Sequence, residues 1–392
     1  MVKIEKIYIG GWFQRTTLHL SEIYDFLKQA DSPLKLDKAK LSELRNEMRI
    51  SSVEMKLGNL DCVIVKSDLG IEVKIYEDGL IVLCKVNGLS IKNEIQTLAT
   101  YYEQKLSPGI RYIFSLGAPI PKDLANIKTI FPYFIILDNS PKQDIKELFG
   151  QFKQEKYFEI LKKEFEIYRG DKLYVINNFS EKLSNIEDFV EEQVFIREFK
   201  SQLHRYLNLH RIIWERIADV KERGKIKGSE VGLFKDKIES YSKTINLIDG
   251  RISQMGTYIR TRESIAKNNA GLANFLDVLD FKYETLADTL EYIKDIWNMT
   301  KNYVNSALDL FSSIQAASTE SSVTNLTVIT SMGVGATLIG LFSEKLPEFH
   351  ISGVMYFLIV ASIGYIANKI MKMIYTRRMY KISDVKIVKD IK

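Results

Sequence analysis

The feature that most constrains this chain is a run of residues without a charged side chain, from Ser321 to Ser343. As a helix rising 1.5 Å per residue, the run would be about 34 Å long, enough to cross the hydrocarbon core of a bilayer. It is nevertheless polar and slim for a membrane span. Its hydroxyl residues and glycines are Thr327, Thr330, Ser331, Thr337, Gly333, Gly335 and Gly340. Such residues allow helices to pack closely, and they also suit a helix that faces a water-filled path.

A second apolar segment follows the first after a short loop. It extends from Ile351 to Tyr375, and its charge-free part ends at Asn368. The loop between the segments, "SEKLPEFH", contains Pro347, which helps the chain to turn. Two adjacent apolar segments predict a pair of membrane-spanning helices. A helical hairpin buried in a protein core is the alternative, and the basic residues that follow the second segment argue against it.

The charges of the chain are unevenly distributed. The net charge is +5, and residues 369–392 hold eight Lys or Arg against two Asp. Basic residues at the end of the second span predict that both chain ends lie in the cytoplasm and that the protein is a multi-pass protein of the cell membrane. The residues expected at the membrane surface are Lys369, Lys372, Arg377 and Arg378. A nucleic-acid partner is not expected, because the basic residues gather in a short tail rather than over a folded face.

Residues 1–180 mix strand and helix patterns and predict a cytoplasmic domain of the α+β (α/β) class. Glu72–Val86 predicts a β-hairpin, with Gly79 in its turn. Further strands are expected at 61–67, 110–116, 133–139 and 172–178, and helices at 21–30, 36–48 and 91–106. Cys62 and Cys84 are predicted to be reduced thiols in the core of this domain. The pattern does not decide between parallel and mixed pairing of the strands.

Residues 181–320 have helical spacing of apolar side chains throughout. Three helices are predicted: one over 181–222, one over 229–267, and one that begins near Gly271 and continues unbroken to Phe342. The last is too long for an ordinary globular helix and predicts a stalk. The expected organisation is a domain at 1–180, long helices at 181–320, spans at 321–343 and 351–375, a loop at 344–350 and a basic tail at 376–392.

The third long helix carries a stripe of small and polar residues at heptad spacing. Its members are Asn302, Asn305, Asp309, Ser312, Ala316, Thr319, Val323, Leu326, Thr330, Gly333, Thr337 and Gly340. Close packing explains single glycines or threonines, whereas Asn302, Asn305 and Asp309 are unusual choices for a dry seam. The alternative is an aqueous path on which Val323 and Leu326 form an apolar constriction. One two-span subunit cannot enclose such a path, so several copies would form a ring. A hydrated divalent cation suits it, because Mg²⁺ gives up water reluctantly.

In the order of its parts the chain resembles the CorA-type magnesium channel family over nearly its whole length. Local resemblance lies in the first span, where Leu326-Thr327, Ile329, Thr337 and Ile339 fit the family pattern "LT-x-I … T-x-I". The resemblance implies a homopentamer gated by its cytoplasmic domain. It implies that Val323, Leu326, Thr330, Val334 and Thr337 line the pore. It further implies regulatory divalent ions near Asp309, with Glu284, Asp288, Glu291 and Asp295 as weaker candidates.

The chain departs from this family at the outer end of the first span. The family has Gly-Met-Asn there, and this chain has Glu344-Lys345-Leu346. The expected function is a channel or transporter for Mg²⁺ or another divalent cation, with Glu344 as an acidic entrance. A non-conducting, membrane-anchored scaffold or sensor is the first alternative. A membrane-tethered enzyme with its site in 1–180 is the second. No standard catalytic motif supports an enzyme, and no activity of that kind is expected.

Overall fold

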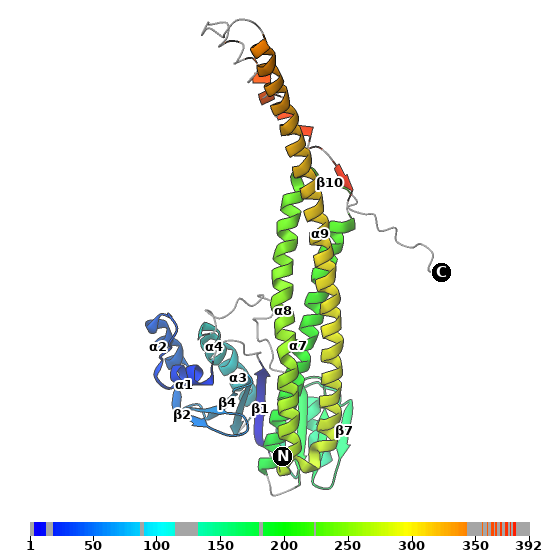
Figure 1. Cartoon of the computed structure of the whole chain (residues 1–392). Helices are drawn as coiled ribbons and strands as arrows, with labels where there is room; N and C mark the ends of the chain where they lie inside the picture. The colour runs from blue at the N-terminus through cyan, green and yellow to red at the C-terminus, as the bar shows by residue number, and fades with distance from the viewer. Residues whose placement is uncertain are drawn as a thin grey trace, which may run out of the picture. The chain divides into compact units, whose positions relative to one another are not determined.

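The computed structural model describes residues 4–12, 19–86, 90–113, 132–179, 183–222 and 225–342, together with isolated residues between 355 and 381. In the last long helix, side chains are described as far as residue 316 and again at 330, 333 and 334. The chain forms two compact units (Figure 1). The sheet unit consists of Met1–Leu207 and Gly250–Lys294, and the helical unit consists of Asn208–Asp249 and Asp295–Lys392.

The sheet unit is built on a nine-stranded mixed sheet with the order β2-β3-β4-β5-β1-β6-β9-β8-β7. The strands are β1 Ile4–Trp12, β2 Ile50–Lys56, β3 Cys62–Ser67, β4 Ile71–Tyr76, β5 Leu80–Val86, β6 Tyr133–Asp138, β7 Phe158–Leu161, β8 Phe165–Arg169 and β9 Leu173–Asn178. Strands β6 and β9 pair in parallel, and the other neighbouring pairs are antiparallel. The predicted hairpin is confirmed as β4 and β5, with Gly79 at a φ of 91° in its turn.

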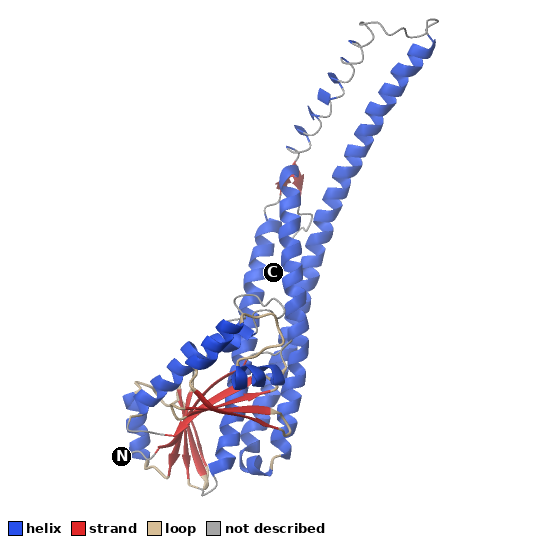
Figure 2. Cartoon of the chain, turned by 90° about the vertical axis from the view of Figure 1, so that its left-hand side faces the viewer, coloured by secondary structure: helices blue, strands red, loops and turns tan. Residues whose placement is uncertain are grey.

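One face of the sheet carries the main apolar core. Alternate residues of the central strands, such as Ile7, Ile9, Val73, Ile75 and Ile135, point into this core and are fully or almost fully buried. The helices that pack against it are α1 Leu20–Gln29, α2 Lys38–Glu47, α3 Ile91–Tyr101, α4 Ser107–Ile113 and α6 Lys142–Gln151; a π-helical turn, Tyr102–Leu106, joins α3 to α4 (Figure 2).

The opposite face of the sheet packs against the first part of α7 Leu183–Glu222. Gly10 on β1 makes this approach possible, because a Cβ there would lie 2.5 Å from Val194 Cγ1 on α7 and 2.7 Å from the Ile81 carbonyl oxygen. Trp12, two residues further along β1, packs on the same helix, and the centroids of the Trp12 and Phe199 rings are 5.0 Å apart. The α7 helix therefore lies directly against the middle of the sheet.

The prediction of a strand at 110–116 is wrong for residues 110–113, which belong to helix α4. Leu106, Ile110 and Ile113 recur at helical spacing, and all three are buried. A Cβ on Gly109 would lie 2.2 Å from Met48 Cε, so the helix also fits tightly against its neighbours. Tertiary packing overrides the strand preference of the aromatic and β-branched residues. The remaining residues of the segment, 114–116, lie outside the described ones.

The long helices agree with the sequence prediction. They are α7 Leu183–Glu222, α8 Gly228–Asn268 and α9 Leu276–Phe342, and a 3₁₀ helix, Ala270–Phe275, precedes α9. The turn between α7 and α8 contains the short strand β10 Lys225–Lys227. It pairs antiparallel with β11 Met379–Lys381, which follows the second predicted span. Both strands belong to the helical unit.

The two cysteines are buried free thiols, as predicted. They lie on β3 and β5, and burial raises the pKa of each thiol to about 12. Neither thiol is ionised near neutral pH, so both act as small apolar side chains of the core.

Candidate functional site

Helix α9 is the element on which most predicted functional residues lie. It is one uninterrupted helix of 67 residues, close to 100 Å long. It begins in the sheet unit and continues into the charge-free run. The prediction of one unbroken helix as far as Phe342 is confirmed, although the α-helix begins at Leu276 and the residues near Gly271 form the preceding 3₁₀ helix.

Within the helical unit, one side of α9 is buried against α7 and α8. Trp297, Val304, Ala307 and Phe311 are almost completely buried. Tyr303 of α9 stacks on Trp214 of α7 with ring centroids 4.4 Å apart. Phe311 of α9 pairs with Phe234 of α8 at 6.4 Å, and Lys301 Nζ lies 3.0 Å from Asp249 Oδ2. This side of α9 is therefore the internal seam of the unit.

The predicted polar residues lie on the side of α9 that does not pack. Asn302, Asn305 and Asp309 follow one another at intervals of three and four, which places them on one face of the helix. All three side chains are exposed in the single chain. The structure thus brings the first three members of the stripe together on a surface that the subunit itself leaves uncovered.

The other predicted residues are described only in part. Glu284, Asp288, Thr330 and Val334 are exposed on α9, and Lys369 and Arg377 are exposed near the C-terminus. The side chains of Val323, Leu326, Thr337, Glu344, Lys372 and Arg378 lie outside the described residues, as do most side chains of the two predicted spans.

Two features expected of a metal-ion channel are absent from the described residues. No helix among them combines the length and hydropathy needed to cross a membrane. No group of three or more His, Cys, Asp or Glu side chains in the described part of the chain is arranged to hold a metal ion.

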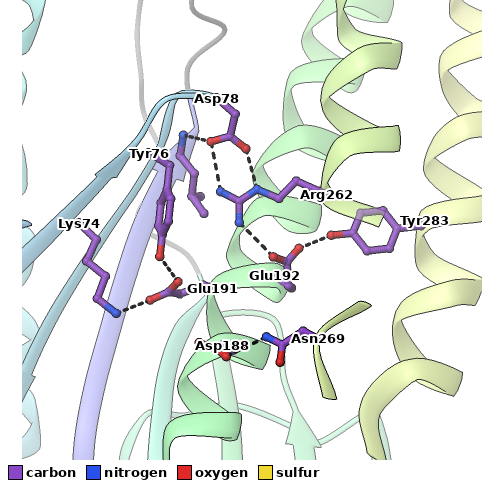
Figure 3. Close-up of polar contacts among 10 residues, drawn as sticks. Lys74, Tyr76, Asp78, Asp188, Glu191, Glu192, Arg262, Asn269 and Tyr283 are labelled. Atoms are coloured by element: carbon purple, nitrogen blue, oxygen red, sulfur yellow. Dashed lines mark hydrogen bonds and ion pairs between the residues drawn. The ribbon is translucent and has the colours of Figure 1, made fainter. Parts of the chain in front are cut away.

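The interior of the sheet unit contains a polar network around Arg262, which sequence reasoning missed (Figure 3). The Arg262 guanidinium of α8 donates through Nε to Asp78 Oδ2 at 2.6 Å and through Nη2 to Asp78 Oδ1 at 3.1 Å. Its Nη1 donates to Glu192 Oε1 of α7 at 3.0 Å. The hydroxyl of Tyr283, on α9, donates to the other Glu192 oxygen. This network therefore joins the β4–β5 turn to all three long helices.

Burial and neighbouring charges have opposite effects on the pKa values of the groups in this network. Burial by itself would lower the pKa of Arg262, but the charges of Asp78 and Glu192 outweigh it and raise that pKa well above its usual value. Burial raises the pKa of Glu192, and the charge of Arg262 opposes this rise. A bidentate pairing of a guanidinium with a carboxylate is the strongest of the common polar contacts, and it fixes geometry as well as energy.

A second ion pair lies beside the first (Figure 3). Lys74 Nζ on β4 is 2.7 Å from Glu191 Oε1 on α7, and the hydroxyl of Tyr76 donates to the other carboxylate oxygen. The charge of Glu191 and its hydrogen bond raise the pKa of Lys74 to a value above its usual range, although burial opposes the rise. Strand β4 is thus held to α7 through two side chains on the same face.

No signal in the sequence identified these contacts. Asp78 stands in a hairpin turn, where Asp is common for local reasons. Its partner Arg262 is 184 residues further along the chain. Only the folded arrangement brings them together.

Comparison with known proteins gives little further information. No family model matches the chain. No curated protein matches it either. One of the matching solved structures is the complete structure of the CorA magnesium transporter from Methanocaldococcus jannaschii, which is 11% identical. The match covers 64% of this chain and 91% of that one, with a TM-score of 0.22. A similarity at this level decides neither the fold nor the function of this chain.

Proposed function

We propose that this protein is a CorA-like, homo-oligomeric membrane channel for Mg²⁺ or another divalent cation, gated by its sheet unit. The observation that carries the proposal is the uncovered polar face of α9, formed by Asn302, Asn305 and Asp309. This face lies on a single helix that leads into the charge-free run. Amide and carboxylate side chains repeated around a ring of subunits form a path suited to a hydrated cation.

The pairing of β10 with β11 supports the topology that the proposal needs. After the second predicted span, the chain pairs at Met379–Lys381 with the turn between α7 and α8. Two membrane spans with a short loop between them return the chain to the side of the membrane on which the first span began. This agrees with a cytoplasmic location for both chain ends, which the basic residues predict.

The Arg262 network supplies a physical link for gating. It connects the β4–β5 turn to Glu192 on α7 and to Tyr283 near the start of α9. In the proposed channel, divalent ions bound to the cytoplasmic acids would close the path at Val323 and Leu326, and movement at the start of α9 would be transmitted along the helix.

Flux into liposomes tests the proposal. The purified chain is reconstituted into liposomes that enclose a dye responsive to divalent cations. Mg²⁺, Co²⁺, Ni²⁺ and Zn²⁺ are then added outside the liposomes in separate assays. We expect entry of at least one of these ions, and we expect Leu326→Ala to raise the basal leak because it removes an apolar constriction. An unchanged leak in this variant would contradict the placement of the gate.

A non-conducting, membrane-anchored scaffold or sensor is the second candidate. Glu344-Lys345-Leu346 at the outer end of the first span favours it, because the chain lacks the Gly-Met-Asn of the channel family there. A correctly inserted oligomer that passes none of the four ions would support this second function and exclude the first.

A further inference from the structure

The sheet unit contains a cavity of about 510 Å³ whose lining is strongly basic. Arg169 comes from β8, Arg197 and Lys200 come from α7, and Lys282 comes from α9. The one acidic residue of the lining is Asp277, and it lies 2.9 Å from Lys162 Nζ. The cavity therefore concentrates positive charge that its own walls do not neutralise.

None of these four basic side chains has a carboxylate partner within the described residues, and Lys282 donates to the amide of Gln193. Arg169 lies over the ring of Tyr157 at 5.5 Å, and neither Arg197 nor Lys200 takes part in a salt bridge of the described chain. Guanidinium groups without carboxylate partners are suited to bind phosphate, because their planar donors match two of its oxygens.

The buried amide of Gln193 also indicates a missing ligand. The Gln193 side chain is 3% exposed and lines the cavity. Its Oε1 accepts hydrogen bonds from Lys282 Nζ and from the Tyr174 hydroxyl. Its Nε2 is buried, and it has no hydrogen-bond partner among the described residues. A buried donor without an acceptor is costly, and an acceptor atom on a ligand in the cavity would satisfy it.

The rim of the cavity is aromatic. Tyr157, Phe158 and Phe281 are 55%, 44% and 71% exposed, which is unusual for large apolar side chains. Exposed flat rings in the lining of a basic cavity provide a surface for a flat ring of the ligand, while the basic residues bind its charged part.

We propose that this cavity binds a nucleoside polyphosphate, with its phosphates near Arg197, Lys200 and Lys282 and its base against the aromatic rim. The three cations Arg169, Arg197 and Lys200, with the amine of Lys282 beside them, fit a ligand with several negative charges better than they fit a single carboxylate. The Gln193 amide then donates to a phosphate oxygen. The proposal concerns the sheet unit alone and does not depend on ion conduction.

Isothermal titration of the full chain in mild detergent tests this proposal. The ligands are ATP, ADP, adenosine, pyrophosphate and inorganic phosphate, each in a separate titration. We expect ATP and ADP to bind, and we expect adenosine and inorganic phosphate to bind at least tenfold more weakly. No heat for any of these ligands with the folded chain would overturn the proposal. Pyrophosphate binding as tightly as ATP would overturn the role of the aromatic rim.

Matched variants separate a binding role from a structural one. Arg197→Ala should weaken ATP binding by about tenfold to a hundredfold, because it removes a charge-assisted contact. Lys163→Ala, an exposed lysine outside the cavity lining, should leave it unchanged. Since Arg197 has no salt-bridge partner in the described chain, its replacement should not unfold the protein, and a thermal melt checks this. Equal affinity in the two variants would contradict the site.

Discussion

At the scale of single residues, Arg262 is the clearest structural determinant. Its replacement by Met would leave Asp78 and Glu192 as buried carboxylates without their cation. Removing one partner of a buried ion pair costs about 3–5 kcal/mol, and we expect that loss in the free energy of unfolding of the sheet unit. Denaturant unfolding followed by tryptophan fluorescence would measure it, since Trp12 Nε1 donates to the Asp78 carbonyl oxygen nearby.

A matched control for this variant is Arg211→Met. Arg211 pairs with Glu215 on the surface, at 3.8 Å between Nε and Oε1. Exposed pairs of this kind contribute about 1 kcal/mol or less. If both variants lost the same stability, the Arg262 network would not hold the sheet unit together as described.

Lys282 gives a pH dependence of known sign. Burial, together with the charges of Arg169, Arg197 and Lys200, lowers its pKa to about 7. The groups that face it are these three cations, the ring of Tyr174 and the amide of Gln193. Between pH 7 and the ordinary lysine pKa near 10.5, the unfolded chain binds more protons than the folded one, so stability rises with pH in this window.

The Lys282→Met variant tests this sign. The variant should gain stability relative to the parent mainly at pH 6 to 7, where the parent must hold a buried charge, and less at pH 9 to 10. Thermal melts of both proteins across this range would show the difference narrowing as pH rises. A difference that is constant with pH would contradict the lowered pKa.

At the scale of elements, the contact of α7 with β1 depends on a glycine. Gly10→Ala would place a methyl group 2.5 Å from Val194 Cγ1, and overpacking of this kind costs about 1–3 kcal/mol. Gly232→Ala is the control, because a Cβ on that helical glycine meets nothing within 4 Å. It should instead stabilise the chain by about 0.4–1 kcal/mol. Comparing the melting temperatures of the two variants checks both expectations.

Periodicity in the sequence predicts the helices and strands better than it predicts how they pack or pair with one another. The length of α9 follows from helical spacing that no proline interrupts, and the β4–β5 hairpin follows from β-branched runs around a glycine turn. The same reasoning fails at Ile110–Ile113, where packing on Met48 and Phe26 selects a helix. Local patterns also cannot show that β6 pairs in parallel with β9, because that pairing depends on topology.

In the candidate site too, local spacing predicts which residues share a helix face, but it does not predict contacts between distant parts of the chain. Asn302, Asn305 and Asp309 share a helical face, so spacing alone places them together. The partners of Arg262 are separated from it by 184 and 70 residues along the chain, and no short-range pattern connects them. The basic cavity draws residues from β8, α7 and α9, which sequence reasoning did not group.

At the scale of the whole molecule, the proposed channel requires self-association. The polar face of α9 is exposed in one chain, and a channel requires several such faces around a common axis. The packed side of the helix, with Trp297, Val304 and Phe311, is already used within the subunit. The polar face therefore remains available for neighbouring copies.

The subunit number is the most direct test of this account. Native mass spectrometry of the full chain in mild detergent should give an oligomer with a ring of identical subunits, five by resemblance to the CorA-type channels. Asn305→Leu, which changes an exposed residue of the polar face, should keep this mass and reduce ion flux. A monomer or dimer would contradict the account, because too few copies of α9 would be present to enclose a path.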